Sequence, residues 1–245
     1  MIKILYLNNE KVCFDLNNMK VIGEGKEGVV YKYNDECIKL FNSNRNSGDL
    51  LSVNEDKFIF FTQLNTQRII LPKQLLYNYK REIEGYLMKY IESNFNLNNI
   101  RNKNINDIIE YLYDLKKDID ILSDNDILIN DLKNPHLLYN GGFYLIDTSL
   151  YSKYQYDNIL KCDVKSKNIS SINQFFIGLL LIQKEGIKDF NLTNRDIPNI
   201  YCKLHNDNFY FIADILEIEA KKYKVNDLSE LRLIYKKGLN FLKNK

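Results

Sequence analysis

The chain has 245 residues, of which 45% are hydrophobic and 27% charged, and its formal net charge is +2. These values predict a globular protein with a sizeable core, and so small a charge argues against nucleic acid as a partner. Four scattered cysteines form no CxxC pair, which argues against a zinc site. We expect a cytoplasmic protein with reduced thiols and no membrane partner, since neither a signal peptide nor a membrane-spanning segment is evident.

Short alternating patterns in the first part of the chain predict antiparallel strands. Apolar residues alternate on both sides of Asn8-Asn9, which is a hairpin signal. In chain order we then expect a strand–turn–strand unit at 21–33, a strand at 37–41, a helix at 52–64, and strands at 68–71, 74–79 and 84–91.

Helical patterns dominate the second part of the chain. The polar, Asn-rich segment 94–104 predicts a link, and an amphipathic helix begins at Ile105. The segment 126–149 returns to short strands, with a hairpin turn at Asn140-Gly141-Gly142. Further helices are predicted at 170–183, which is apolar on nearly all sides and therefore buried, and at 207–222 and 227–243. Together these elements predict an α+β fold.

The first segment with candidate chemistry is the glycine pattern Gly23-x-Gly25-x-x-Gly28-x-Val30. Glycines there allow the backbone to turn sharply and to approach phosphate oxygens closely. The residues that follow are strand formers, which argues against a dinucleotide-binding loop, since such a loop leads into a helix. Considered alone, an ordinary Gly-rich hairpin explains the pattern equally well.

A single lysine, Lys39, lies in the next apolar strand. A cation in the middle of a strand is costly to bury without a partner, and ATP phosphates would be such a partner. Glu55, early in the next predicted helix, is the expected counter-ion. Taken singly, a solvent-facing lysine and a solvated glutamate are the simpler interpretations, but their order after the glycine pattern favours a functional pair.

In this order the residues resemble the protein-kinase superfamily, from about Val21 to Leu181. The resemblance implies a single bilobal domain of residues 1–245. Residues 1–91 would form an antiparallel sheet lobe with one helix and an extra N-terminal hairpin, and residues 92–245 a mainly helical lobe.

The same resemblance assigns the nucleotide site. Lys39 and Glu55 would pair and hold the α- and β-phosphates of ATP under the glycine loop. Met88 would be the gatekeeper residue. The backbone of the hinge, Lys89, Tyr90 and Ile91, would bind the adenine.

A second cluster, Ile129-Asn130-Asp131-Leu132-Lys133 followed by Asn134-Pro135-His136, resembles the kinase catalytic loop. The resemblance implies that Asp131 accepts or orients the acceptor hydroxyl and that Lys133 steadies the γ-phosphate. Asp147 follows an apolar strand, where the family has the aspartate of its D-F-G motif, and would hold Mg²⁺.

Several residues depart from the family pattern. His136 replaces the metal-binding Asn and is the second metal candidate beside Asp147, although imidazole is a poor Mg²⁺ ligand. Ile129-Asn130 replaces His-Arg, and Thr148-Ser149 replaces Phe-Gly. Asn173 stands where the buried helix normally carries Asp, and no A-P-E motif follows Asp147, so a reduced peptide platform is expected.

The sequence therefore predicts an atypical, minimal Ser/Thr protein kinase of bacterial or phage type that uses ATP and Mg²⁺ on a protein substrate. A small-molecule kinase similar to aminoglycoside or choline kinases is one alternative, favoured by the reduced platform. A pseudokinase that binds nucleotide or acts as a scaffold is the other, favoured by His136 and by the missing His-Arg.

Overall fold

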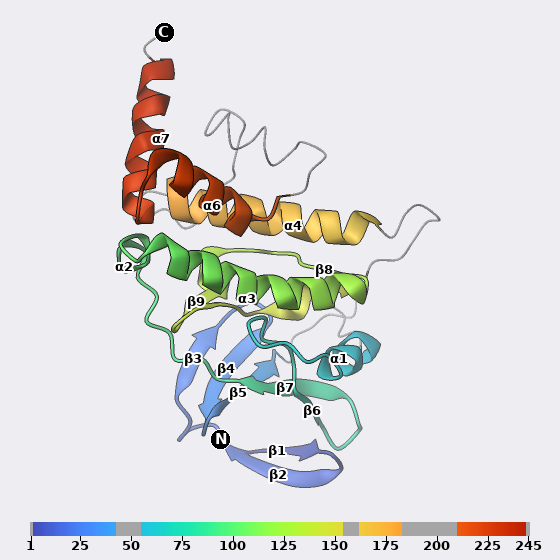
Figure 1. Ribbon diagram of the computed structural model, residues 1–245. Coiled ribbons are helices and arrows are strands. Elements are labelled where there is room, and N and C mark those ends of the chain that lie inside the picture. Colours follow the sequence, from blue (N-terminus) through green and yellow to red (C-terminus); the bar gives the residue numbers. More distant parts are fainter. Residues whose placement is uncertain (1, 43–54, 154–161, 183–209, 244–245) are drawn as a thin grey trace. The chain divides into compact units, whose positions relative to one another are not determined.

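The computed structural model describes residues 2–42, 55–153, 162–182 and 210–243 (Figure 1). It confirms the predicted α+β class. The chain divides into two compact units, the first formed by Met1–Thr66 and Ile70–Ile91 and the second by Gln67–Ile69 and Glu92–Lys245. Among the described residues, no helix combines the length and the apolar character that crossing a membrane requires.

The first unit contains a seven-stranded antiparallel sheet in the order β2-β1-β6-β7-β5-β4-β3. The predicted hairpin at Asn8-Asn9 is confirmed, since both residues have positive φ and join β1 to β2. The elements are β1 (Ile2–Leu7), β2 (Glu10–Asp15), β3 (Val21–Glu24), β4 (Gly28–Tyr33), β5 (Glu36–Phe41), α1 (Glu55–Thr62), β6 (Gln74–Tyr77) and β7 (Ile83–Lys89).

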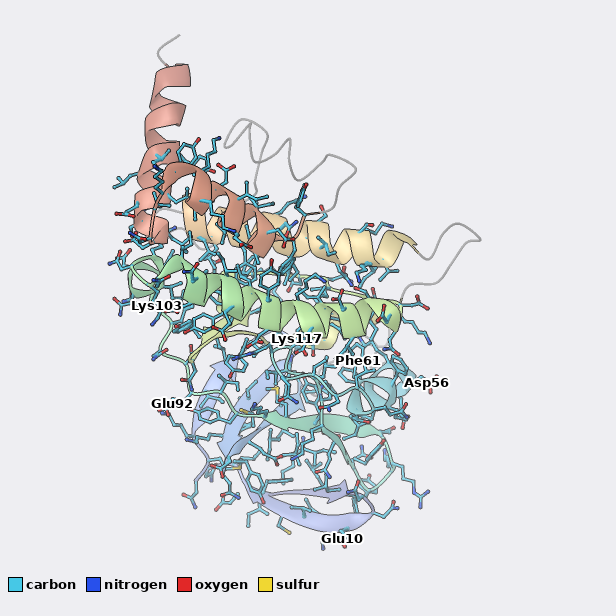
Figure 2. All side chains as sticks on the ribbon, viewed as in Figure 1. Glu10, Asp56, Phe61, Glu92, Lys103 and Lys117 are labelled. Carbon is cyan, nitrogen blue, oxygen red and sulfur yellow. The ribbon has the colours of Figure 1, made fainter. Side chains whose placement is uncertain are left out.

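The two faces of this sheet are packed differently. One face carries an aliphatic core, and Phe14 of the N-terminal hairpin is buried in it. On the other face an aromatic cluster joins α1 to the sheet, with Phe58 of α1 centred 5.7 Å from Phe41 and 5.5 Å from Tyr86. Phe61, labelled in Figure 2, extends this cluster along α1. Residues that alternate along β5 therefore face either aliphatic or aromatic surroundings.

The second unit is mainly helical. Its long helix α3 packs against α4 and α6, and the predicted hairpin turn is confirmed at Gly141 and Gly142, which both have positive φ. The elements are α2 (Leu97–Arg101), α3 (Ile105–Asp124), β8 (Ile127–Leu128), a 3-10 turn (Asn134–His136), β9 (Leu137–Tyr139), β10 (Phe143–Leu145), a 3-10 turn (Thr148–Leu150), β11 (Ser152–Lys153), α4 (Cys162–Ile177), a π-helical turn (Gly178–Ile182), α6 (Ile212–Tyr223) and α7 (Leu228–Lys243).

Two predicted elements are wrong. The segment 94–104 is no simple link, because it contains the helix α2, which the Asn96 side chain caps. Arg101 of this helix is buried and donates to the carbonyls of Leu179 and Leu180. The segment 68–71 is no strand beyond one bridge at Ile69. The backbone N–H groups of Gln67, Arg68 and Ile69 donate instead to the buried carboxylate of Asp118 at 2.5–2.8 Å.

Candidate functional site

The glycine pattern of the first unit extends from the end of β3 through the turn into β4, and only Gly25 lies in the turn itself. These strands are antiparallel, so the predicted hairpin is confirmed and a dinucleotide-binding loop, which would lead into a helix, is excluded. Asn42, just after β5, holds the turn in place. Its side chain donates to the carbonyls of Gly25 and Lys26, and its backbone N–H donates to that of Glu27.

The three glycines have different reasons to lack a side chain. A Cβ on Gly28 would lie 2.0 Å from the carbonyl oxygen of Leu40, so the packing of β4 on β5 requires glycine there. A Cβ on Gly23 would make only ordinary contacts at 3.7 Å, and one on Gly25 would meet nothing within 4 Å. The packing of the sheet therefore explains why position 28 is glycine. It does not require glycine at positions 23 and 25, where a ligand could approach the backbone closely.

Lys39 is buried on the aromatic face of the sheet, with 5% of its surface exposed. In the register of the sheet it pairs with Val30 on β4 and with Tyr86 on β7. Its Nζ lies 2.9 Å from Oε2 of Glu27, which belongs to the glycine turn. The structure thus joins the predicted phosphate-binding lysine directly to the predicted phosphate-binding turn.

Glu55 lies elsewhere in this unit. It is exposed in the first turn of α1, where burial and the neighbouring Glu55 carboxylate raise the pKa of Tyr77. It lines a hollow of about 730 Å³ that Tyr6 and the turns after β1 and β6 also border. Pairing of Lys39 with Glu55 stays a prediction. Glu27 was not singled out from the sequence, because its position depends on how the turn folds back over β5.

Glu27→Gln is expected to destabilise the first unit, because Lys39 would lose a charged partner while remaining buried. Removing one member of such a pair costs roughly 1–3 kcal/mol. Glu55→Gln, the same change at an exposed position, is expected to alter the free energy of unfolding by less than about 0.5 kcal/mol. Urea unfolding of both variants measures the difference. Equal effects would show that the Glu27 contact contributes no more than a surface charge.

The predicted hinge residues lie at the end of β7. Met88 is buried and pairs with Cys37 in the sheet register. Lys89 is the last residue of the strand, and the Tyr90 N–H donates to the Asp35 carbonyl at 3.4 Å. Ile91 is half-buried and is the last residue of this unit.

In the second unit the structure brings four of the predicted site residues together. The Lys133 ammonium forms an ion pair with Oδ1 of Asp131. His136 lies between the two aspartates: its Nδ1 is 2.9 Å from the Asp131 backbone carbonyl, and its Nε2 is 3.4 Å from Oδ2 of Asp147. Residues from two separate loops thus converge on one imidazole.

Both aspartates have left-handed backbone conformations, with φ of 57° at Asp131 and 60° at Asp147. Such conformations are uncommon outside glycine and persist where the surroundings impose them, often at functional sites. Here Ile146 N–H donates to the His136 carbonyl at 2.8 Å, and the Ser149 hydroxyl donates to Oδ1 of Asp147 at 3.0 Å. The first contact holds the start of the Asp147 loop against His136, and the second fixes where the Asp147 carboxylate points.

The strand that leads into the Asp131 loop is held by Asn168 of α4, a buried residue that the sequence analysis missed. Its Oδ1 accepts from the Ile129 N–H at 2.8 Å, and its Nδ2 donates to the Ile127 carbonyl at 2.8 Å. Asn173, which stands where the family's buried helix normally carries Asp, holds the start of α6 through the Tyr210 carbonyl and the Ile212 N–H. Both residues are buried asparagines of α4, and the partners of each depend on how the helix packs.

A metal ion fits this site only together with phosphate. Within the described parts of the chain, no group of three or more His, Cys, Asp or Glu residues could hold a metal ion. Mg²⁺ in phosphoryl-transfer sites, however, is bound by one or two carboxylates and completed by phosphate oxygens and water. Asp147, which is partly exposed, could supply such a carboxylate.

A comparison with models of protein families and a comparison with curated proteins both found no match. Function is therefore inferred from the residues of the chain and from their geometry.

Proposed function

We propose that the chain is an ATP-dependent phosphotransferase of the protein-kinase type that transfers the γ-phosphate to a Ser or Thr hydroxyl of a protein. The observation that carries this proposal is the convergence of Asp131, Lys133 and Asp147 around His136. The resemblance predicted this group from motifs that lie apart in the sequence, and the three charged side chains are those that phosphoryl transfer needs.

Each charged residue of the second unit has a role in the proposed reaction. The Asp131 carboxylate orients the acceptor hydroxyl and takes its proton as the new oxygen–phosphorus bond forms and the bond to ADP breaks. Lys133, next to Asp131, stabilises charge on the transferred group. Asp147 would hold the metal ion, which when bound neutralises phosphate charge.

The first unit would bind the nucleotide. At Gly23 and Gly25 of its glycine turn, no side chain hinders the approach of a phosphate to the backbone. Lys39 supplies a buried positive charge beside that turn. The backbone from Lys89 to Ile91 is the proposed adenine site, by resemblance.

Gly25→Ala is expected to lower nucleotide affinity several-fold without loss of stability, because its Cβ meets no protein atom but would obstruct a phosphate. Gly28→Ala is the matched variant, and it should destabilise the protein by several kcal/mol because its Cβ overlaps the Leu40 carbonyl. Thermal unfolding with and without ATP separates the two effects. Unchanged affinity in a folded Gly25→Ala protein would contradict a role for this turn in phosphate binding.

The proposal is tested by incubating the protein with radiolabelled ATP, a divalent metal and casein as a generic protein acceptor. Label in casein or in the protein itself is expected. Label that enters only an aminoglycoside or choline would identify the small-molecule alternative. Absence of transfer together with absence of stabilisation by nucleotide would overturn the proposal.

A second candidate function is nucleotide binding without transfer. It is favoured by His136, whose Nε2 faces Asp147 where the resemblance leads us to expect an amide oxygen. Stabilisation by ATP without transfer under any metal would support this candidate over an active kinase.

A further inference from the structure

The proton on the His136 ring can be assigned from its contacts. Nδ1 lies 2.9 Å from the backbone carbonyl of Asp131, and a carbonyl oxygen only accepts, so Nδ1 carries the hydrogen. In the neutral ring Nε2 then presents a lone pair, and it faces Oδ2 of Asp147 at 3.4 Å. In this neutral form two acceptors point toward each other.

This arrangement is that of a histidine prepared to bind a metal. Histidine ligands generally donate the hydrogen of their other nitrogen to a backbone carbonyl or a carboxylate, which fixes the ring and the tautomer. Two ligands with bonds of about 2.1 Å to one ion lie roughly 3.0–3.4 Å apart for right-angled to tetrahedral geometry. The separation of Nε2 and Oδ2 agrees with that range.

We propose that His136 Nε2 and Asp147 Oδ2 form a nitrogen–oxygen ligand pair that selects a first-row transition ion such as Mn²⁺ over Mg²⁺. The ion would be bound with the nucleotide, so this inference rests on the proposed function. Phosphate oxygens and water would complete its coordination.

The selectivity follows from the chemistry of the two donors. Mg²⁺ prefers an all-oxygen octahedron and binds imidazole poorly, whereas the affinity of nitrogen donors for first-row divalent ions rises from Mn²⁺ to Cu²⁺ and falls again at Zn²⁺. An asparagine at position 136 would offer an amide oxygen and favour Mg²⁺. His136 would thus change the metal preference of a kinase-like site from Mg²⁺ to a first-row transition ion.

The test is electron spin echo spectroscopy of Mn²⁺ bound to the full chain with a non-hydrolysable ATP analogue. A directly bound imidazole nitrogen is expected in the wild-type spectrum, and it should shift when histidine is labelled with ¹⁵N. The chain has only two histidines, so His136→Asn should abolish the signal and His205→Asn, the same change at the other histidine, should retain it.

Affinity gives an independent readout. His136→Asn should reduce the preference for Mn²⁺ over Mg²⁺ in analogue binding by at least about 10-fold. A wild-type complex without the nitrogen signal, or an unchanged preference in His136→Asn, would overturn the metal assignment and leave the proposed function standing. Failure of the wild type to bind the analogue with either metal would overturn both.

Discussion

Asp147→Asn is expected to abolish phosphate transfer, lowering the rate on the order of 1000-fold. Asparagine has the same shape and tolerates the left-handed backbone that Asp147 adopts, so the fold should be retained. The Ser149 hydroxyl can still donate to an amide oxygen at this position. What the variant loses is the negative charge that would hold the metal ion.

The second unit offers a matched control for this change. Asp126 also has a left-handed backbone, with φ of 58°, and lies just after α3, outside the group around His136. Asp126→Asn should leave the transfer rate within about twofold of wild type, since asparagine has the same shape and tolerates the left-handed backbone at this half-buried position. The rate of label transfer at saturating ATP measures both variants. Retained activity in Asp147→Asn would remove Asp147 from the metal site.

The elements of the fold that depend on local patterns could be predicted from the sequence. The hairpin at Asn8-Asn9 is an example, because alternating strands around two residues that tolerate positive φ specify their own register. The glycine turn was recognised because residues that favour strands follow the glycines. The helix predicted at 170–183 is confirmed in its described part, although α4 begins earlier, at Cys162, and continues into a π-helical turn at Gly178–Ile182.

The errors arose where long-range contacts replace local ones. The segment 68–71 was predicted as a strand from its composition, yet the N–H groups of Gln67, Arg68 and Ile69 donate to Asp118 on α3, far away in the sequence. Arg101 stabilises a short helix in a polar segment, because its guanidinium donates to carbonyls of the π-helical turn. No periodicity within either segment carries that information.

The candidate site likewise contains residues that local motifs predict and residues that only long-range contacts reveal. Asp131, Lys133 and Asp147 follow motifs and were named from the sequence, and the structure places them together. The contact of Glu27 with Lys39 depends on the path of a turn, and that of Asn168 with Ile129 depends on how a helix packs. Residues that support a site are harder to recognise in a single sequence than the residues they position, because their contacts are set by tertiary geometry.

Asn168→Ala is expected to reduce both stability and transfer. The change leaves the Ile129 N–H and the Ile127 carbonyl buried without the asparagine, which costs roughly 2–5 kcal/mol of unfolding free energy. Because Ile129 lies two residues before Asp131, the loop that carries the proposed base would lose an anchor. A misplacement of about 1 Å can lower a rate on the order of 100-fold, so the transfer rate should fall even where the variant is folded.

Asn173→Ala provides the comparison that separates positioning from stability. Asn173 lies on the same helix, is as deeply buried, and also makes two backbone hydrogen bonds, but these hold the start of α6. Its loss should cost similar stability and leave the rate of transfer per folded molecule near that of wild type. The decisive measurement is the transfer rate of both variants well below their unfolding temperatures. Equal rates would mean that Asn168 supports the second unit as a whole and does not set the geometry of Asp131.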